Sequence, residues 1–345
     1  MRSQPPEIAR NMRTVALRAG VSTATVSRVL NGSGAVKAET AERVRKALKE
    51  LRFIPNPSAT TLKYGRSNTY GIILPDLTNP FYPEFLLEFE DVFVEQDHEV
   101  LVATTQSSQQ KLTNTVRRML MRRVDGVVMM ASEVDTRAVE PILNQQIPIV
   151  TIDRRRAQKG CADVAIAFED GYREAVLRLK ALGHRSIGFI GGTEGLRTSE
   201  IRLQAFQQAL AEAELRFEPR FVRAGDYRVN GGDAAMRSLL RQQRRPTAVM
   251  TVNDLTALGA LRALHALGIG VPTQMSLVGF DGILLGEAAF PPLTTVAVAR
   301  REMAERCLEA LGKLQQNVGT RGPLLSVPVL LVERESTGPA PRTRT

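Results

Sequence analysis

The chain has 345 residues, of which 43% are hydrophobic and 24% are charged, as in a water-soluble protein with two or three globular domains. The net charge of +10 is unevenly placed, because residues 1–66 hold thirteen of the 46 Lys and Arg residues but only four of the 36 Asp and Glu residues. This asymmetry excludes a uniformly basic surface and favours a nucleic-acid-binding module joined to a nearly neutral globular part.

The remaining bulk features exclude further classes of protein. Cys161 and Cys307 are far apart, which implies neither a disulfide framework nor a metal site and favours a reducing cytoplasm. The three histidines have no metal-ligand spacing. No apolar run is long enough to cross a bilayer, and residues 1–10 are too polar for a signal peptide. We therefore expect a cytoplasmic protein with no membrane association, no metal and no cofactor.

Two short helices joined by a glycine turn are predicted within residues 11–32, after a lead-in over residues 1–10 that we expect to be disordered. Apolar side chains at helical spacing over residues 12–19 predict the first helix, and Gly20 suits the left-handed position that ends it. Ser22 is placed to cap a second helix. The buried stripe of that helix comprises Val26, Val29 and Leu30.

The outer face of the second helix carries small and polar side chains and one arginine. These residues are Thr23, Ala24, Ser27 and Arg28. Small side chains allow the backbone to approach the base edges of DNA, and an arginine can donate to guanine O6 and N7. A helix, a turn and a capped helix of this kind predict a helix-turn-helix that presents its second helix to the major groove.

Residues 19–31, A-G-V-S-T-A-T-V-S-R-V-L-N, resemble the DNA-binding headpiece of the LacI/GalR family of bacterial transcriptional regulators. This chain has Thr14 where the family has an acidic residue, and we expect a modest effect on the start of the first helix or on phosphate positioning. The alternative is a surface helical hairpin with no role in DNA binding. The resemblance implies DNA contacts from Thr14, Ser22, Thr23, Ala24, Thr25, Ser27, Arg28 and Asn31.

A third helix over residues 38–51 is predicted by its apolar spacing, and its outer face carries basic residues that contact phosphates or face water. Residues 55–62 then form a linker too short to be a stable helix alone. The resemblance implies that this linker is a hinge helix, which orders on operator DNA and inserts a leucine into the minor groove. The matching residues are Asn56, Ala59 and Leu62. The family's basic residue near Thr60 is absent, and a plain interdomain linker is the alternative.

From Thr69 onward, buried apolar strands alternate with amphipathic helices, which predicts parallel α/β sheets. The number of strands exceeds what one domain usually holds, so we expect two sheets. The predicted strands are Tyr70–Leu74, Val100–Ala103, Gly126–Met130, Ile147–Ile152, Val164–Ala167, Ser186–Ile190, Ala248–Val252 and Ser276–Phe280.

Several of these strands lead directly into a polar residue: Asp76, Asp153, Asn253 with Asp254, and Asp281. Ligands of open parallel sheets bind beyond the carboxyl ends of the strands. Carboxylates and an amide gathered there suit a ligand rich in hydroxyl groups, such as a sugar. Any one of these residues could instead cap a helix, but four from separate strands favour a shared binding site.

Five motifs of this region also resemble the effector domain of the LacI/GalR family: residues 77–82, 123–126, 181–184, 251–254 and 278–281. The resemblance implies the fold of type I periplasmic sugar-binding proteins, with two Rossmann-like lobes of parallel sheet joined by three crossovers. We expect these crossovers near residues 163–167, 291–295 and 325–328. The expected organisation is a helix-turn-helix headpiece at 11–54, a hinge at 55–66, an effector-binding and dimerisation domain at 67–338 and a disordered tail at 339–345. Its N-lobe spans about 67–163 and 293–325, and its C-lobe about 164–292 and 326–338.

The resemblance further implies which residues bind the effector. These are Asp76, Asn79, Phe81, Asp153, Arg202, Tyr227, Asn253 and Asp281. The family's second aspartate after Asp281 is replaced by Gly282, which leaves that contact without support. Residues 79–82 and 227–232 are most similar to the ribose-regulator branch, so a pentose is the first expectation, with a hexose, a sugar acid or a purine as alternatives.

The glycine-rich segment 188–195 lacks a Walker lysine and a dinucleotide spacing, and we predict a strand-to-helix turn that lines the cleft. No recognisable catalytic motif is present, so we do not expect an enzyme. A periplasmic-type sugar-binding protein and an α/β enzyme with an accessory DNA-binding domain are the alternatives. The favoured interpretation is a repressor that binds a near-palindromic double-stranded operator as a homodimer and responds to a sugar-like effector.

Overall fold

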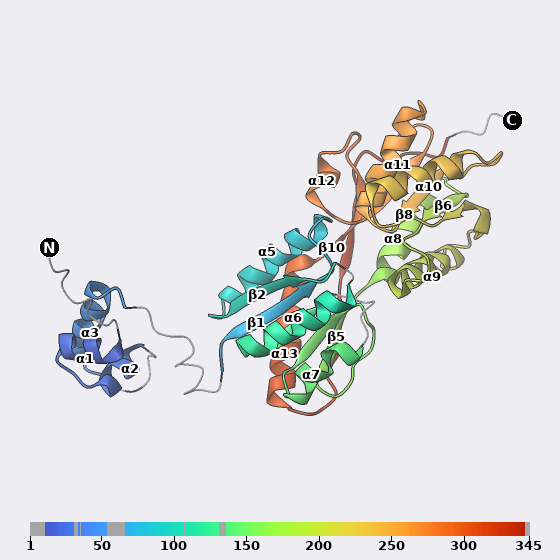
Figure 1. Cartoon of the computed structure of the whole chain (residues 1–345). Helices are drawn as coiled ribbons and strands as arrows, with labels where there is room; N and C mark the ends of the chain where they lie inside the picture. Colours follow the sequence, from blue (N-terminus) through green and yellow to red (C-terminus); the bar gives the residue numbers. More distant parts are fainter. Residues whose placement is uncertain are drawn as a thin grey trace, which may run out of the picture. The chain divides into compact units, whose positions relative to one another are not determined.

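The computed structural model describes residues 11–30, 34, 36–53, 66–106, 108–130 and 136–341. The chain divides into two units, Met1–Ser67 and Asn68–Thr345, each with its own hydrophobic core (Figure 1). The predicted hinge at residues 55–62 lies outside the described part of the chain. Among the helices that are described, none combines the length and the apolar character needed to span a bilayer.

The first unit contains three helices, α1 (Met12–Ala19), α2 (Thr23–Leu30) and α3 (Ala38–Glu50). Gly20 ends α1 with a φ of 67°, which confirms the predicted left-handed turn. Ser22 Oγ accepts the Thr25 N–H at 3.2 Å, as predicted for the cap of α2. The small core consists of Val15, Ala16, Ala19, Val26, Val44 and Ala47.

The second unit contains two six-stranded sheets, one in each of two lobes. The N-lobe sheet has the order β11-β5-β4-β3-β1-β2 and is parallel throughout. Its strands are β1 (Thr69–Leu74), β2 (Glu99–Thr104), β3 (Gly126–Met129), β4 (Ile149–Ile152), β5 (Cys161–Ile166) and β11 (Leu324–Val327).

The C-lobe sheet has the order β12-β10-β9-β8-β6-β7, and only β12 among its described strands runs antiparallel to its neighbour. Its strands are β6 (Ile187–Ile190), β7 (Val222–Arg223), β8 (Ala248–Thr251), β9 (Ser276–Asp281), β10 (Thr294–Val298) and β12 (Val329–Val332). The central strands β6, β8 and β9 are buried at every position, which explains their continuous apolar sequence.

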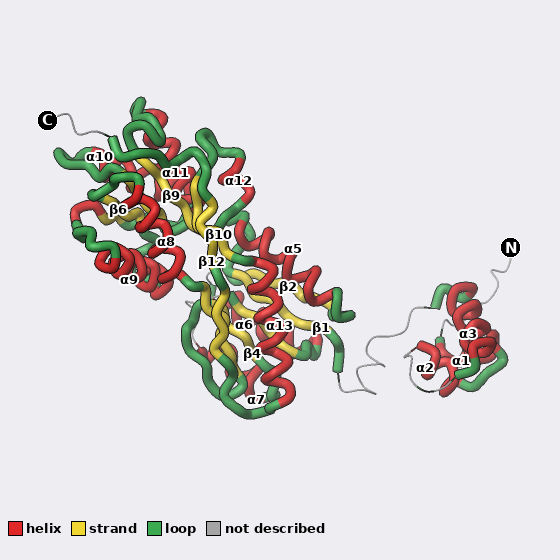
Figure 2. Tube along the Cα trace, turned by 180° about the vertical axis from the view of Figure 1, so that it is seen from behind, coloured by secondary structure: helices red, strands yellow, loops and turns green. Residues whose placement is uncertain are grey.

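Helices cover both faces of each sheet (Figure 2). In the N-lobe, α5 (Phe81–Val94) and α13 (Arg300–Gln316) cover one face, and α6 (Gln109–Arg122) and α7 (Glu140–Asn144) cover the other. In the C-lobe the corresponding pairs are α8 (Phe168–Ala181) with α9 (Arg197–Glu212), and α10 (Val229–Leu240) with α11 (Asp254–Ala266). The short α12 (Leu284–Glu287) follows β9, and 3-10 turns lie at Thr136–Val139 and Pro219–Phe221.

The chain passes between the lobes three times, at Ala167, Ala299 and Pro328. Hydrogen bonds join these crossings, because the Ala167 N–H donates to Val327 O at 3.0 Å and the Ala299 N–H donates to Pro328 O at 3.3 Å. Three narrow connections of this kind allow the lobes to change their relative orientation.

The second crossing lies later than the expected residues 291–295. Residues 294–298 form β10, which pairs with β9 and β12 and therefore stays in the C-lobe. Thr295 is buried there and donates its hydroxyl to Asp254 Oδ1 at 2.6 Å, so the segment belongs to the C-lobe core. The N-lobe accordingly resumes at Arg300 rather than at residue 293.

The C-terminal segment also differs from expectation, because order extends beyond residue 338. Buried His184 contacts the Gly338 carbonyl through Nε2 at 3.0 Å, and the Ala340 N–H donates to Leu182 O at 2.8 Å. These contacts tie residues 338–340 to the C-lobe. The rest of the expected tail, from residue 342, lies outside the described residues.

Candidate functional sites

In the first unit, α2 presents the face that the sequence predicts for contact with DNA. Thr23, Ala24 and Arg28 are exposed, whereas Val26 on the opposite face is fully buried. The residues Ser22, Thr25 and Ser27 complete this face with hydroxyl groups. The arrangement leaves small polar side chains and one guanidinium group available to a groove of DNA.

Two features of α1 and α3 add to the predicted DNA-binding surface. In α1, Asn11 Oδ1 accepts both the Thr14 N–H at 2.9 Å and the Thr14 hydroxyl at 3.1 Å, so Thr14 helps to fix the start of the helix. On α3, Arg43, Lys46 and Lys49 are exposed and available to phosphates. The other predicted DNA-binding residues, Asn31, Asn56, Ala59 and Leu62, lie outside the described residues.

In the second unit, a cavity of about 460 Å³ lies between the two lobes. All eight side chains that the sequence predicts for effector binding line it: Asp76, Asn79, Phe81, Asp153, Arg202, Tyr227, Asn253 and Asp281. Four of them stand where strands β1, β4, β8 and β9 end, at the carboxyl edges of the two sheets. The structure thus brings the predicted set together, while contact with a ligand stays a prediction.

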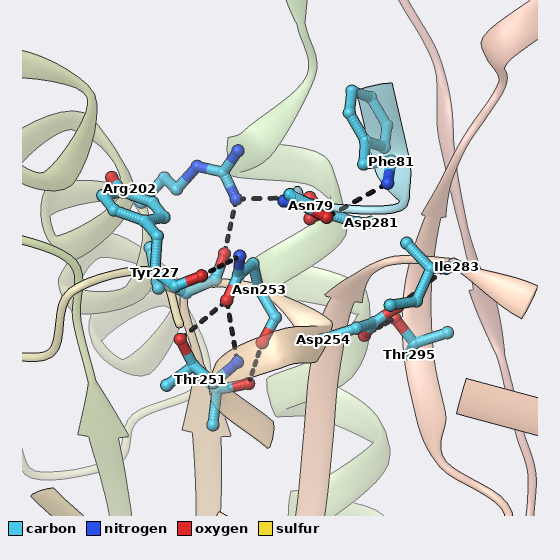
Figure 3. A network of polar contacts seen from close by, with 12 residues as sticks. Asn79, Phe81, Arg202, Tyr227, Thr251, Asn253, Asp254, Asp281, Ile283 and Thr295 are labelled. Atoms are coloured by element: carbon cyan, nitrogen blue, oxygen red, sulfur yellow. Dashed lines mark hydrogen bonds and ion pairs between the residues drawn. The ribbon is translucent and has the colours of Figure 1, made fainter. Parts of the chain in front are cut away.

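Arg202 and Asp281 form the most deeply buried charged pair of this cavity (Figure 3). Arg202 Nη1 lies 3.7 Å from Asp281 Oδ1, and the guanidinium group stacks over the Phe168 ring at 4.3 Å. Its Nε atom is buried and has no hydrogen-bond partner among the described residues. A buried donor without a partner is costly, and a bound ligand oxygen could satisfy it.

Burial changes the protonation of the carboxyl groups in the cavity. It raises the pKa of Asp281 to about 6, although the Arg202 charge and a hydrogen bond from Asn79 act in the opposite direction. It also raises the pKa of Asp153 to about 7, against the effect of the Ile166 N–H, which donates to Asp153 Oδ1 at 2.7 Å. Near neutral pH these carboxyl groups can therefore accept a hydrogen bond from a ligand hydroxyl when ionised, or donate one when protonated.

Three of the cavity residues have a backbone conformation that side-chain-bearing residues seldom adopt. The φ angles are 60° at Asp153, 62° at Tyr227 and 114° at Asp281. Such strain persists only where surrounding contacts hold it, and it gathers at binding sites. Next to Asp281, Gly282 has a φ of 73°, and a Cβ atom there would meet Ala297 at 2.5 Å. This close approach explains why Gly282 occupies the position of the family's second aspartate.

Other cavity residues serve the fold as well as the cavity surface. Asn253 caps α11, because its Oδ1 accepts the Thr256 N–H at 2.9 Å, and its Nδ2 donates to Tyr227 O at 3.1 Å. Asp76 Oδ1 accepts the Thr78 N–H and hydroxyl at 2.7 Å each, which shapes the loop before α5. Asn253 and Asp76 therefore position the backbone of the cavity in addition to lining it.

Arg228 also lines the cavity but is not among the residues predicted from the sequence, and its side chain connects the two lobes. This C-lobe residue donates from Nη1 to Thr78 Oγ1 at 3.1 Å and lies 3.6 Å from Asp76 Oδ2, both in the N-lobe. The sequence signal that indicates Arg228 is its position directly after Tyr227, within the segment 227–232 that resembles the ribose-regulator branch. The missed lining residues also include Thr78, Tyr82, Thr193, Thr198 and Asp226, of which Thr193 belongs to the predicted glycine-rich turn.

Comparison with known proteins finds matches along nearly the whole chain. Residues 11–56 match the family described as "Bacterial regulatory proteins, lacI family", and residues 176–337 match the "Periplasmic binding protein-like domain". The HTH-type transcriptional repressor CytR of Escherichia coli strain K12 is 32% identical over 333 residues, which are 96% of this chain and 98% of CytR.

Two solved structures are similar over the same extent. One is the lac repressor dimer bound to operator and the anti-inducer ONPF, with a TM-score of 0.83 and 28% identity over 95% of this chain and 99% of that chain. The other is the transcriptional regulator CelR in complex with cellobiose, with a TM-score of 0.71 and 30% identity over 94% of this chain and 99% of that chain. Both similarities include the helix-turn-helix unit and the two-lobed unit.

Proposed function

This chain belongs to the LacI family of bacterial regulatory proteins. From this premise we propose that it is a repressor whose affinity for operator DNA is altered by a small sugar in the interlobe cavity. The observation that carries the proposal is the cavity itself, where eight residues predicted from sequence converge. The exposed face of α2 supplies the DNA-binding part. The site of action is the cytoplasm, where the operator lies.

The chemistry of the cavity favours a ligand with several hydroxyl groups. Carboxylates from Asp76, Asp153 and Asp281 accept hydrogen bonds, Arg202 donates them, and the rings of Phe81 and Tyr227 offer apolar surface. A volume of about 460 Å³ accommodates a small sugar. Cellobiose occupies the structure of CelR, which supports the same ligand class here. A pentose remains the first expectation from the ribose-like motifs.

A screen of the full chain against pentoses, hexoses, disaccharides and nucleosides tests this proposal. A ligand that binds only the native state raises the melting temperature, and each such compound is then added to an operator-binding assay. We propose a binding function without chemical conversion, so the compound should change operator affinity and be recovered intact. Consumption of the compound would instead support an enzyme, and the absence of any effect on operator binding would remove the proposed coupling.

The Arg28 side chain is expected to contact a base. Replacing Arg28 by alanine should weaken binding to the specific operator by roughly 1–3 kcal/mol and binding to random DNA much less. Fluorescence anisotropy with both DNA molecules measures the difference. The matched control is Arg43→Ala on α3, an exposed position expected to affect both DNA molecules equally. Equal losses for Arg28→Ala would assign Arg28 to the phosphate backbone.

An exposed apolar face of the second unit fits a second copy of the chain. Glu84 Oε1 of α5 accepts the Leu284 N–H of α12 at 3.1 Å, so these helices lie side by side. The exposed apolar residues of α5 and α12 are Leu87, Val94, Leu284 and Leu285, and Phe290, which is 96% exposed, follows α12 in the chain. The lac repressor assembles as a dimer. We propose that this face forms the corresponding dimer interface.

Charge placed on this apolar face is expected to separate the dimer. The double variant Leu87→Asp/Leu284→Asp should be a monomer by sedimentation analysis, because two carboxylates would be desolvated in the interface. Operator affinity should fall by about 100-fold or more, since one chain no longer holds its partner at the second half-site. Leu177→Asp, at an exposed apolar position on α8, is the control and should stay dimeric. A dimeric double variant would place the interface elsewhere.

A further inference from the structure

Arg300, the first residue of α13, joins the two lobes immediately beside the second crossover. Its Nη1 donates to Asp281 O at 3.0 Å, and its Nη2 donates to Gly282 O at 2.9 Å. The same Nη2 lies 2.8 Å from Glu84 Oε2 on α5. A residue of the N-lobe thus holds the C-lobe backbone at the turn that carries Asp281.

Glu84 adds a third attachment between the same segments. While one of its carboxylate oxygens pairs with Arg300, the other accepts the N–H of Leu284 at 3.1 Å. The side chains of Arg300 and Glu84 are 18% and 16% exposed, so the pair is largely removed from water. Arg300 Nη2 and Glu84 Oε2 form an ion pair, since Glu84 Oε2 has no hydrogen-bond partner among the described residues. The hydrogen bonds that Arg300 donates to the two carbonyl groups, and the one that Glu84 Oε1 accepts from Leu284, are charge-assisted and strong in such an environment.

The segment that this pair holds lies between the cavity and the proposed dimer face. Asp281 contributes its side chain to the cavity wall, whereas its carbonyl group and that of Gly282 point to Arg300. Leu284, three residues further on, begins α12 on the apolar face. Neither Arg300 nor Glu84 lines the cavity, so their action on a ligand can only be indirect.

We propose that the Arg300–Glu84 pair is the positioning device that ties the orientation of the lobes to the backbone at Asp281. A ligand that binds the Asp281 side chain then displaces a turn that the N-lobe holds by three hydrogen bonds, two from Arg300 and one to Glu84. The relative orientation of the two lobes changes as a consequence. This regulatory role rests on the proposed effector function of the cavity. Asp281, whose carbonyl group accepts from Arg300, also has the strained φ of 114°.

The neighbouring Arg301 provides a matched control for this role. It lies on the same helix and pairs with Glu95 of α5 at 2.8 Å, a contact contained within the N-lobe. An Arg300→Gln variant removes the contacts of this side chain with the C-lobe backbone. Arg301→Gln removes an ion pair of similar length that lies within the N-lobe. Arg300→Lys keeps a charge beside Glu84 but cannot donate to two carbonyl groups in a fixed fork.

The test is the distance between the lobes of the ligand-free full chain, measured by pulsed electron spin resonance. Spin labels are attached at Gln109→Cys of α6 and Gln204→Cys of α9, which are exposed, while the native Cys161 and Cys307 are buried. Dilution with unlabelled chain leaves one labelled protomer in each dimer. We expect Arg300→Gln to broaden and shift the distribution, Arg300→Lys to do so partly, and Arg301→Gln to match the unsubstituted chain.

Operator affinity and melting temperature are measured on the same variants. A changed operator affinity for Arg300→Gln, with Arg301→Gln unchanged, would support the positioning role. A lowered melting temperature of Arg300→Gln with unaltered interlobe distances would show that Arg300 only maintains the fold, and would overturn the proposal. Failure of the sugar screen on the unsubstituted chain would contradict the proposed function alone, because the distance measurement uses no ligand.

Discussion

Replacing Arg202 by glutamine, or Asp281 by asparagine, is expected to weaken effector binding by about tenfold or more. A hydroxyl group both donates and accepts, so a polyol needs donors and acceptors from the protein. Arg202 supplies only donors, including the buried Nε that has no partner among the described residues, and Asp281 supplies an acceptor. Neither residue can replace the other, and losing either leaves a ligand hydroxyl unpaired.

The structure adds a second consequence, because the two side chains are partners of each other at 3.7 Å. Their exposed fractions are 11% and 6%, so removing one charge leaves the other buried without its opposite charge. Breaking a buried pair in this way typically costs about 3–5 kcal/mol of stability. Each single variant should therefore unfold at a lower temperature as well as bind the effector more weakly.

The double variant Arg202→Gln/Asp281→Asn separates these two effects. It leaves two neutral amides that can bond to each other, so most of the lost stability should return. Effector binding should not return, because the charge-assisted contacts to the ligand are still absent. Calorimetric titration with the sugar selected by the thermal screen, paired with thermal unfolding, measures both. Binding by the double variant equal to that of the unsubstituted chain would make the pair purely structural.

Most of the cavity could be predicted because one geometric rule places it. The carboxyl ends of parallel strands share an edge, so the polar residues after β1 and β4 gather at the edge of one sheet and those after β8 and β9 at the edge of the other. The rule selects Asp76, Asp153, Asn253 and Asp281, and the two-lobed fold implied by the family resemblance places the two edges on one cleft. Arg202 and Tyr227 lie on a helix and in a loop, and they were accessible only through family resemblance.

The contacts that join the lobes could not be predicted in the same way. Arg228 reaches Thr78 across 150 residues of sequence, and Glu84 reaches Leu284 across 200. Their partners depend on how two separately folded lobes are oriented, which no local periodicity encodes. The second crossover was misplaced for a related reason. Strand β10 begins with two threonines, which suggests a connecting segment in the sequence. Its place in the C-lobe core depends on the buried hydrogen bond from Thr295 to Asp254.

Asp254 leads to the second large expected effect, a fall in stability as the pH rises. Burial raises its pKa to about 8, with a further contribution from the Asp281 charge, and the Thr295 hydroxyl and the Ile283 N–H only partly offset this. The folded chain therefore holds a proton that the unfolded chain has released above an ordinary pKa of 3.8. Stability must fall with pH where the native state binds more protons.

The window of this effect runs from about pH 4 to about pH 8, with Asp281 and Asp153 contributing up to about pH 6 and 7. One unit of pKa corresponds to about 1.4 kcal/mol, so the raised pKa of Asp254 alone corresponds to a loss of several kcal/mol across the window. In Asp254→Asn, the amide oxygen can accept from Ile283 and the amide nitrogen can donate to Thr295. That variant should be more stable than the unsubstituted chain at pH 8 and show a shallower slope.

Urea unfolding at pH values from 5 to 9 measures the slope, and Asp233→Asn is the control with the opposite sign. Hydrogen bonds from Arg237 and Arg262 lower the pKa of Asp233, so its carboxylate stabilises the fold above its ordinary pKa and loses that effect only in acid. Removing it should lower stability about equally from pH 6 to pH 9 and leave the slope unchanged. A slope for Asp254→Asn as steep as that of the unsubstituted chain would show that the buried carboxyl is already ionised at neutral pH, with Thr295 and Ile283 stabilising the charge.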